Sequence, residues 1–200
     1  MIVGIDFDNT IVCYDNLFHK VALEKGLIPN TLSKNKLAIR NFMREAGIEQ
    51  QWTEMQGYVY GARMIEAHPY EGVLDFIDSL INNGHSVRII SHKTQFPFIG
   101  PKYDLRKAAR AWIEKYINHD GQILVGDDLI YFESTNKEKI FRINTISPDF
   151  YVDDLPEILL DEDFSNSVKR ILFSPKENLD FSGIALSSWK DISDYIHGFS

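Results

Sequence analysis

The sequence predicts an α/β fold, in which a parallel sheet is covered by helices on both faces. Short apolar runs alternate with longer stretches that have helical spacing, and this alternation is typical of a parallel sheet. A second observation is the stretch 15–66, which contains no convincing strand. We therefore expect a parallel-sheet core that carries an inserted helical segment.

The first strand is the short apolar run 2–5, and two acids follow it at Asp6 and Asp8. Residues two apart in extended chain lie on the same side, so both carboxylates should point to one place. Two acids held close together repel and raise one another's pKa. A fold tolerates this where a cation lies between them or where one acid holds a proton. This pattern indicates a divalent metal site with a carboxylate nucleophile.

The segment after the first strand predicts three helices, over 15–25, 34–46 and 50–67. A plain crossover between parallel strands needs only about a dozen residues, so this segment is longer than a connection requires. We interpret residues 14–69 as a helical cap domain. Residues 1–13 and 70–200 then form the α/β core.

The rest of the chain continues the alternation of helices and strands. Gly72 precedes a helix with a broad apolar face, and Asn83-Gly84 ends it, as glycine does at helix C-termini. The expected helices are 72–83, 104–117, 136–143, 156–160 and 188–197, and the expected strands are 87–90, 122–125, 130–132, 150–152, 170–173 and 184–186.

Composition excludes several classes of protein. With 21 basic and 29 acidic residues among 200, the net charge of −8 argues against binding of nucleic-acid phosphates. The single cysteine, Cys13, rules out an internal disulfide and fits a reducing compartment. No apolar run is long enough to span a membrane, and the N-terminus lacks a signal pattern. We expect a cytoplasmic protein that binds neither nucleic acid nor membrane, and the sequence leaves its oligomeric state open.

Polar side chains follow three of the expected strands: Asp6 and Asp8, then Ser91, then Asp153 and Asp154. The carboxyl ends of parallel strands meet at one edge of the sheet, where ligands of open α/β folds bind. Carboxylate oxygens suit Mg²⁺, which we expect between Asp6 and Asp153. A hydroxyl and a lysine would hold the oxygens of a phosphoryl group as negative charge spreads over them.

These motifs resemble those of the haloacid dehalogenase-like (HAD) phosphohydrolases. Asp6-Phe7-Asp8-Asn9-Thr10 resembles the family's first motif, Asp-x-Asp-x-Thr, and the strand ending at Ser91 resembles its second. A lysine early in the helix 136–143 resembles the third, and Asp153-Asp154 resembles the fourth. The resemblance covers residues 1 to about 175 and implies a Rossmann-like core with an inserted helical cap.

The resemblance also implies a role for each motif residue. Asp6 would attack phosphorus, and Asp8 would protonate the leaving group and then activate water. Ser91 and the lysine would clamp the phosphoryl group. Mg²⁺ would be bound by the side chains of Asp6 and Asp153 and the backbone carbonyl of Asp8, with Asp154 supporting it. Candidate substrate contacts are Asn9, Thr10, His92 and Lys93.

Some assignments stay open at this stage. Lys137 and Lys139 both lie near the start of their helix, and we favour Lys139 because the run 139–143 resembles the family pattern. His92 and Lys93 could touch the substrate, orient the acid or be ordinary loop residues. Gly126-Asp127-Asp128 could imitate the fourth motif, although we interpret it as a turn.

The leading function is a Mg²⁺-dependent phosphomonoester hydrolase that acts on a small phosphorylated metabolite through an aspartyl-phosphate. A receiver-like phosphoaccepting signalling domain is an alternative, but Asp8, two residues after the nucleophile, favours turnover of the intermediate. A phosphomutase of the same superfamily is another. The sequence does not identify the substrate.

Overall fold

The computed structural model describes residues 1–175 and 181–199, which form two compact units. The first comprises Met1–Val12, Pro69–Lys93 and Glu114–Ser200, and the second comprises Cys13–His68 and Thr94–Ile113. The second unit includes residues 94–113, which lie outside the predicted cap, 14–69. No helix in the described ranges has the length and apolar character needed to cross a bilayer.

The first unit contains a six-stranded sheet in the order β10-β9-β8-β1-β4-β7, in which all neighbouring strands are parallel. The predicted α/β fold class is therefore confirmed. The strands are β1 (Ile2–Ile5), β4 (Ser86–His92), β7 (Ile130–Glu133), β8 (Phe150–Asp153), β9 (Lys169–Phe173) and β10 (Ile184–Leu186).

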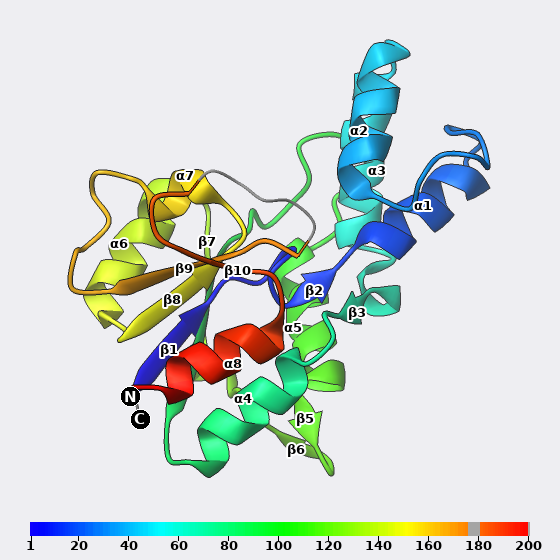
Figure 1. Cartoon of the computed structure of the whole chain (residues 1–200). Coiled ribbons are helices and arrows are strands. Elements are labelled where there is room, and N and C mark those ends of the chain that lie inside the picture. Colours follow the sequence, from blue (N-terminus) through cyan, green and yellow to red (C-terminus); the bar gives the residue numbers. More distant parts are fainter. Residues whose placement is uncertain (176–180, 200) are drawn as a thin grey trace. The chain divides into compact units, whose positions relative to one another are not determined.

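Helices α6 (Asn136–Ile146) and α7 (Pro156–Leu159) lie on one face of this sheet, and α4 (Val73–Asn82) and α8 (Trp189–His197) lie on the other (Figure 1). Ile140 and Ile143 of α6 pack with Tyr151 in one buried cluster. On the opposite face, the rings of Phe76 and Trp189 lie 5.2 Å apart. Both faces of the sheet are therefore covered, as the near-continuous apolar strands require.

The central strand β1 has a close neighbour at Gly4. Tyr151 of β8 lies across Gly4 and donates a hydrogen bond of 2.6 Å to the carbonyl of Ile90 in β4. A methyl group at position 4 would lie 2.7 Å from Cδ2 of Tyr151. Glycine is needed here because a larger residue would occupy the space of the ring. Tyr151 thereby connects the two strands that flank β1.

Gly4→Ala should therefore lower the free energy of unfolding by about 1–3 kcal/mol, because the added methyl overpacks a buried site. Urea unfolding measures the loss. In a Tyr151→Leu background the ring is absent, so Gly4→Ala should cause only a small further loss of stability. An equal loss in both backgrounds would contradict this contact.

The second unit is mostly helical and contains α1 (Asp15–Glu24), α2 (Lys36–Glu45) and α3 (Glu49–Tyr60). α3 ends earlier than predicted, and a 3-10 turn, η1 (Met64–Glu66), follows it. Pro97 lies so close to Gly57 of α3 that a methyl there would be 2.6 Å from its Cβ. This approach explains why the loop after residue 93 belongs to the helical unit.

Helix α5 (Leu105–Tyr116) begins in the second unit and ends in the first. Three two-residue strands are not among the predicted elements: β2 (Val12–Cys13), β3 (His68–Pro69) and β5 (Asn118–His119). β2 pairs with β3, and β5 pairs with β6 (Gln122–Ile123) in a small hairpin. Strands this short carry no periodicity that a sequence could reveal.

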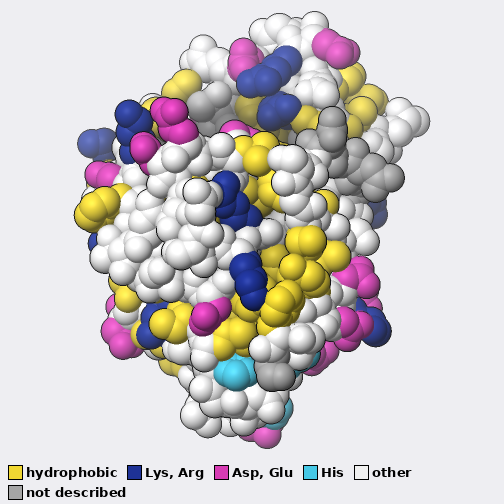
Figure 2. All heavy atoms as spheres, turned by 60° about the vertical axis from the view of Figure 1, so that its left-hand side comes forward, with side chains coloured by type: hydrophobic (Ala, Val, Ile, Leu, Met, Phe, Trp, Pro, Cys, Tyr) yellow, Lys and Arg dark blue, Asp and Glu magenta, His cyan; other side chains and the backbone are white. Residues whose placement is uncertain are grey.

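The space-filling view in Figure 2 shows one face, on which acidic and basic side chains are interspersed and apolar side chains gather near the middle. Among the described residues, Phe98 and Phe141 are large apolar side chains with 88% and 71% of their surface exposed. Single exposed apolar side chains are common on protein surfaces.

Candidate active site

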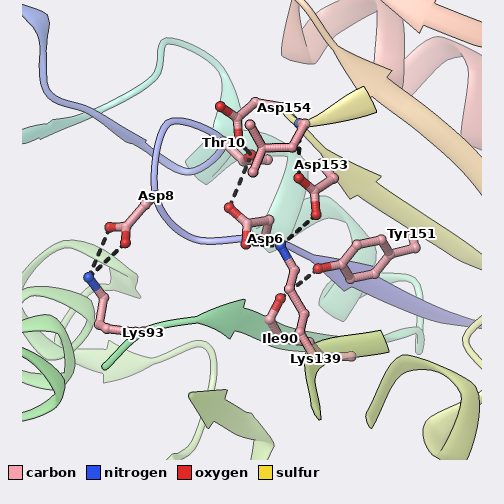
Figure 3. A network of polar contacts seen from close by, with 10 residues as sticks. Asp6, Asp8, Thr10, Ile90, Lys93, Lys139, Tyr151, Asp153 and Asp154 are labelled. Carbon is pink, nitrogen blue, oxygen red and sulfur yellow. Dashed lines mark hydrogen bonds and ion pairs between the residues drawn. The ribbon is translucent and has the colours of Figure 1, made fainter. Parts of the chain in front are cut away.

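The acids Asp6, Asp153 and Asp154 come together at the carboxyl edge of the parallel sheet. Asp6 follows β1, Asp153 ends β8, and the backbone N–H of Asp6 donates to the carbonyl of Val152 at 2.9 Å. One carboxylate oxygen from each of the three acids lies within 4.8 Å of the others. Neighbouring parallel strands thus bring residues almost 150 positions apart into one cluster (Figure 3).

Lys139 joins two of these acids. Its Nζ lies 2.6 Å from Oδ1 of Asp6 and 2.7 Å from Oδ2 of Asp153, and the residue is 1% exposed. Burial lowers the pKa of Lys139, but the charges of Asp153 and Asp6 outweigh it and hold this pKa above its usual value. Lys139 therefore contributes a buried positive charge to the site.

The start of α6 fixes where Lys139 lies. The Thr135 hydroxyl accepts from the N–H of Glu138 at 3.1 Å, and the Glu138 carboxylate accepts from the N–H of Thr135 at 3.0 Å. This capping box begins the helix at Asn136 and places Lys139 in its first turn, next to the packed Ile140. Lys137 is exposed, so the structure brings Lys139 and not Lys137 to the acids.

The loop after β1 positions the remaining residues of the first motif. Asn9 has a φ of 62°, in the left-handed region that asparagine tolerates, and its N–H donates to Val12. The buried Thr10 hydroxyl lies 3.5 Å from Oδ2 of Asp6 and 3.3 Å from Oδ1 of Asp154. The indole N–H of Trp189 donates to the Thr10 carbonyl at 3.2 Å and anchors the loop to α8.

Asp8 lies apart from this cluster in a second ion pair. Its two carboxylate oxygens are 2.8 and 3.0 Å from Nζ of Lys93, as Figure 3 shows. The role of Lys93 was left open by the sequence, because contact between residues 85 positions apart depends on the tertiary fold.

Ser91 and His92 have different surroundings. Ser91 is buried in β4, where it pairs in register with Phe132. His92 is exposed, and its Nε2 lies 3.1 Å from the carbonyl of Ser134. Contact of either residue with a phosphoryl group stays a prediction. Asp127 and Asp128, the alternative acidic pair, lie in the 3-10 turn η2 (Asp127–Leu129), which fits their interpretation as a turn.

The donor set fits a hard divalent cation. Three carboxylates, those of Asp6, Asp153 and Asp154, share the cluster with one ammonium, so negative charge is in excess. Carboxylate oxygens are the ligands that Mg²⁺ prefers, and a divalent ion would balance that excess. The residues present could therefore hold Mg²⁺.

The pKa of Asp6 is raised from 3.8 to about 6, because burial raises it more than the Lys139 ammonium lowers it, and the charge of Asp153 adds to the rise. Without metal, between about pH 4 and 6, the folded state keeps a proton that the unfolded state has lost. The free energy of unfolding should then fall as pH increases through this window, by up to about 3 kcal/mol.

Urea unfolding in EDTA from pH 4 to 7 tests this expectation, with Asp6→Asn as the matched variant that cannot titrate. The stability of the wild type minus that of the variant should decrease as pH rises. A difference that stays flat or increases with pH would contradict the raised pKa.

The sequence matches no protein-family model and no curated protein. Solved structures resemble the fold along nearly the whole chain. A HAD family hydrolase from Deinococcus radiodurans R1 with bound phosphate and sodium has 12% identity and a TM-score of 0.59, covering 98% of this chain and 94% of its own. A predicted phosphoglycolate phosphatase from Haemophilus somnus 129pt has 12% identity and a TM-score of 0.59, covering 98% and 97%.

A predicted phosphatase from Clostridium acetobutylicum has 16% identity and a TM-score of 0.58, covering 98% of each chain. At these identities the likeness establishes the fold. This chain therefore has the fold of the haloacid dehalogenase-like superfamily, the family that its motifs resemble.

Proposed function

We propose that this chain is a magnesium-dependent phosphomonoester hydrolase that acts on a small phosphorylated metabolite. The observation that carries the proposal is the cluster of Asp6, Asp153 and Asp154, with the buried Lys139 ammonium between the first two. A cation and an ammonium at one edge of a sheet are suited to neutralise a phosphoryl group. Several structures with this fold are of hydrolases and phosphatases.

In the first step, a carboxylate oxygen of Asp6 attacks phosphorus and the bond from phosphorus to the ester oxygen breaks. The leaving oxygen takes a proton from the Asp8 carboxyl group, so that an alcohol and an aspartyl-phosphate result. In the second step, water attacks phosphorus and gives a proton back to Asp8. The bond between Asp6 and phosphorus breaks, and inorganic phosphate leaves.

Two further groups would hold the substrate in place. Lys139 would bind phosphoryl oxygens while keeping Asp6 oriented through its contact of 2.6 Å. The Ser91 hydroxyl would be a second donor to the phosphoryl group. Magnesium bound by Asp6 and Asp153, with the Asp8 carbonyl and with Asp154 in support, would withdraw negative charge from the phosphoryl oxygens.

We also propose that the helical second unit acts as the cap that selects the leaving group. Each of its segments follows a site residue closely in sequence: Cys13 comes shortly after Thr10, and Thr94 directly follows Lys93. Both segments are therefore connected to the first unit within a few residues of the candidate site.

Phosphate release by the purified chain tests the proposed function. The substrates are p-nitrophenyl phosphate and a panel of phosphorylated sugars, nucleotides and amino acids, each with Mg²⁺ and with EDTA. We expect release that requires the metal and is fastest for one class of metabolite. Absence of release from every substrate, or equal release in EDTA, would contradict the proposal.

A further inference from the structure

Lys93 directly follows β4, and its side chain is enclosed by the protein although it is a charged residue. Only 2% of the side-chain surface is exposed. Its backbone N–H donates to the carbonyl of Glu133 at 2.8 Å, which anchors it to β7. Its Nζ lies 5.4 Å from the centre of the Phe7 ring. Burying an ammonium is energetically unfavourable unless it is paired with an opposite charge. The acid that pairs with Lys93 therefore indicates the role of this lysine.

That partner is the carboxylate of Asp8. Nζ contacts both of its oxygens, at 2.8 and 3.0 Å, so the contact restrains the orientation of the carboxylate as well as its place. The side chain of Asp8 is 21% exposed, ten times the fraction of its partner. Lys93 thus contacts the Asp8 carboxylate from the protein interior, and part of the carboxylate remains exposed to solvent.

Lys93 and Lys139, the buried lysines among the described residues, contact different acids. Lys139 contacts Asp6 and Asp153, whereas Lys93 contacts Asp8 (Figure 3). Under the proposed function, Asp6 is the nucleophile and Asp8 transfers protons. The nucleophile and the proton-transferring acid therefore contact different lysines. A substitution of Lys93 acts on the acid that is assigned to proton transfer.

We propose that Lys93 is a positioning residue that fixes the Asp8 carboxyl group for proton transfer to the leaving oxygen. This role rests on the proposed phosphohydrolase function and develops the alternative, left open by the sequence, that Lys93 orients the acid. Misplacement of a reacting group by about 1 Å can lower a rate by about 10²-fold, so loss of this restraint should be visible in the kinetics.

The dependence of kcat/KM on the leaving group distinguishes a residue that positions the acid from a residue that binds the phosphoryl group. An alkyl phosphate needs a proton on its leaving oxygen, whereas 2,4-dinitrophenyl phosphate expels a stable anion without one. Since kcat/KM reports on steps up to formation of the aspartyl-phosphate, it isolates the first proton transfer. Lys93→Met should lower kcat/KM for the alkyl substrate by roughly 10- to 100-fold and change it little for the dinitrophenyl substrate.

The variants are chosen to isolate the contact. Methionine has a stem of similar length, and Lys93→Gln provides the same comparison if the methionine variant does not fold. Lys93→Arg keeps a cation and should lose less activity than Lys93→Met. In an Asp8→Asn background, Lys93→Met should cause no further loss with the alkyl substrate. Lys190→Met, which breaks the exposed pair with Asp194, is the matched control and should leave kcat/KM unchanged.

Three results would overturn the role of Lys93 while leaving the proposed function intact. They are full activity of both Lys93→Met and Lys93→Gln, an equal loss for both leaving groups, and an undiminished loss in the Asp8→Asn background. An equal loss would assign Lys93 to the phosphoryl group instead. A wild type that releases no phosphate from any substrate would overturn the proposed function, and the role of Lys93 with it.

Discussion

Asp6→Asn should reduce the release of phosphate by on the order of 10⁴-fold or more, because an amide cannot replace the carboxylate as nucleophile. The fold should survive this change. Asparagine matches aspartate in size, and the raised pKa of Asp6 indicates that burial disfavours the charge that the variant removes. Steady-state release of phosphate with Mg²⁺ at neutral pH is the measurement.

Asp128→Asn is the matched control, because Asp128 is an exposed acid in the turn that imitates the fourth motif. This variant should keep full activity. Wild-type rates in Asp6→Asn, or a large loss in Asp128→Asn, would show that the nucleophile has been assigned to the wrong acid.

Lys139→Met should destabilise the protein by about 3–5 kcal/mol in the absence of metal. The substitution leaves Asp6 and Asp153 facing each other with no cation between them, and removal of one partner from a buried ion pair carries this penalty. Under the proposed function activity should also fall, because the substitution removes the ammonium that is proposed to bind the phosphoryl oxygens. Urea unfolding in EDTA and phosphate release with Mg²⁺ measure the two effects.

Addition of Mg²⁺ should return part of the stability lost in Lys139→Met, because a divalent cation shields the same carboxylates. Lys137→Met is the control on the same helix. Lys137 is exposed, and its loss should change the free energy of unfolding by no more than about 0.5 kcal/mol. If Lys137→Met had the larger effect, the assignment of Lys139 would be wrong.

Much of the fold could be predicted because the signals are local. The strand before Asp6 and the strand before Asp153 are clean apolar runs, and polar residues mark where each one ends. The parallel sheet follows from the alternation of strands and helices. The choice of Lys139 over Lys137 was based on the resemblance of the run 139–143 to the family pattern. The capping box from Thr135 to Glu138 is a further local signal, not used in that choice, that marks where the helix begins.

Other features depend on contacts that no local pattern encodes. The sequence left Lys93 among the open assignments, because only the folded chain brings it to Asp8. Residues 94–113 belong to the helical unit because Pro97 packs on Gly57, which their spacing does not reveal. Gly4 did carry a signal that was not used, since a glycine inside an apolar strand often marks the close approach of another group.

The most direct test of this account is a crystal structure of the chain grown with Mg²⁺ and beryllium fluoride, which mimics a phosphoryl group on a carboxylate. The account predicts beryllium bonded to a side-chain oxygen of Asp6, a magnesium ion shared by Asp6 and Asp153, and Lys139 in contact with fluoride. Beryllium fluoride on another residue, or a magnesium ion that contacts neither of these acids, would contradict it.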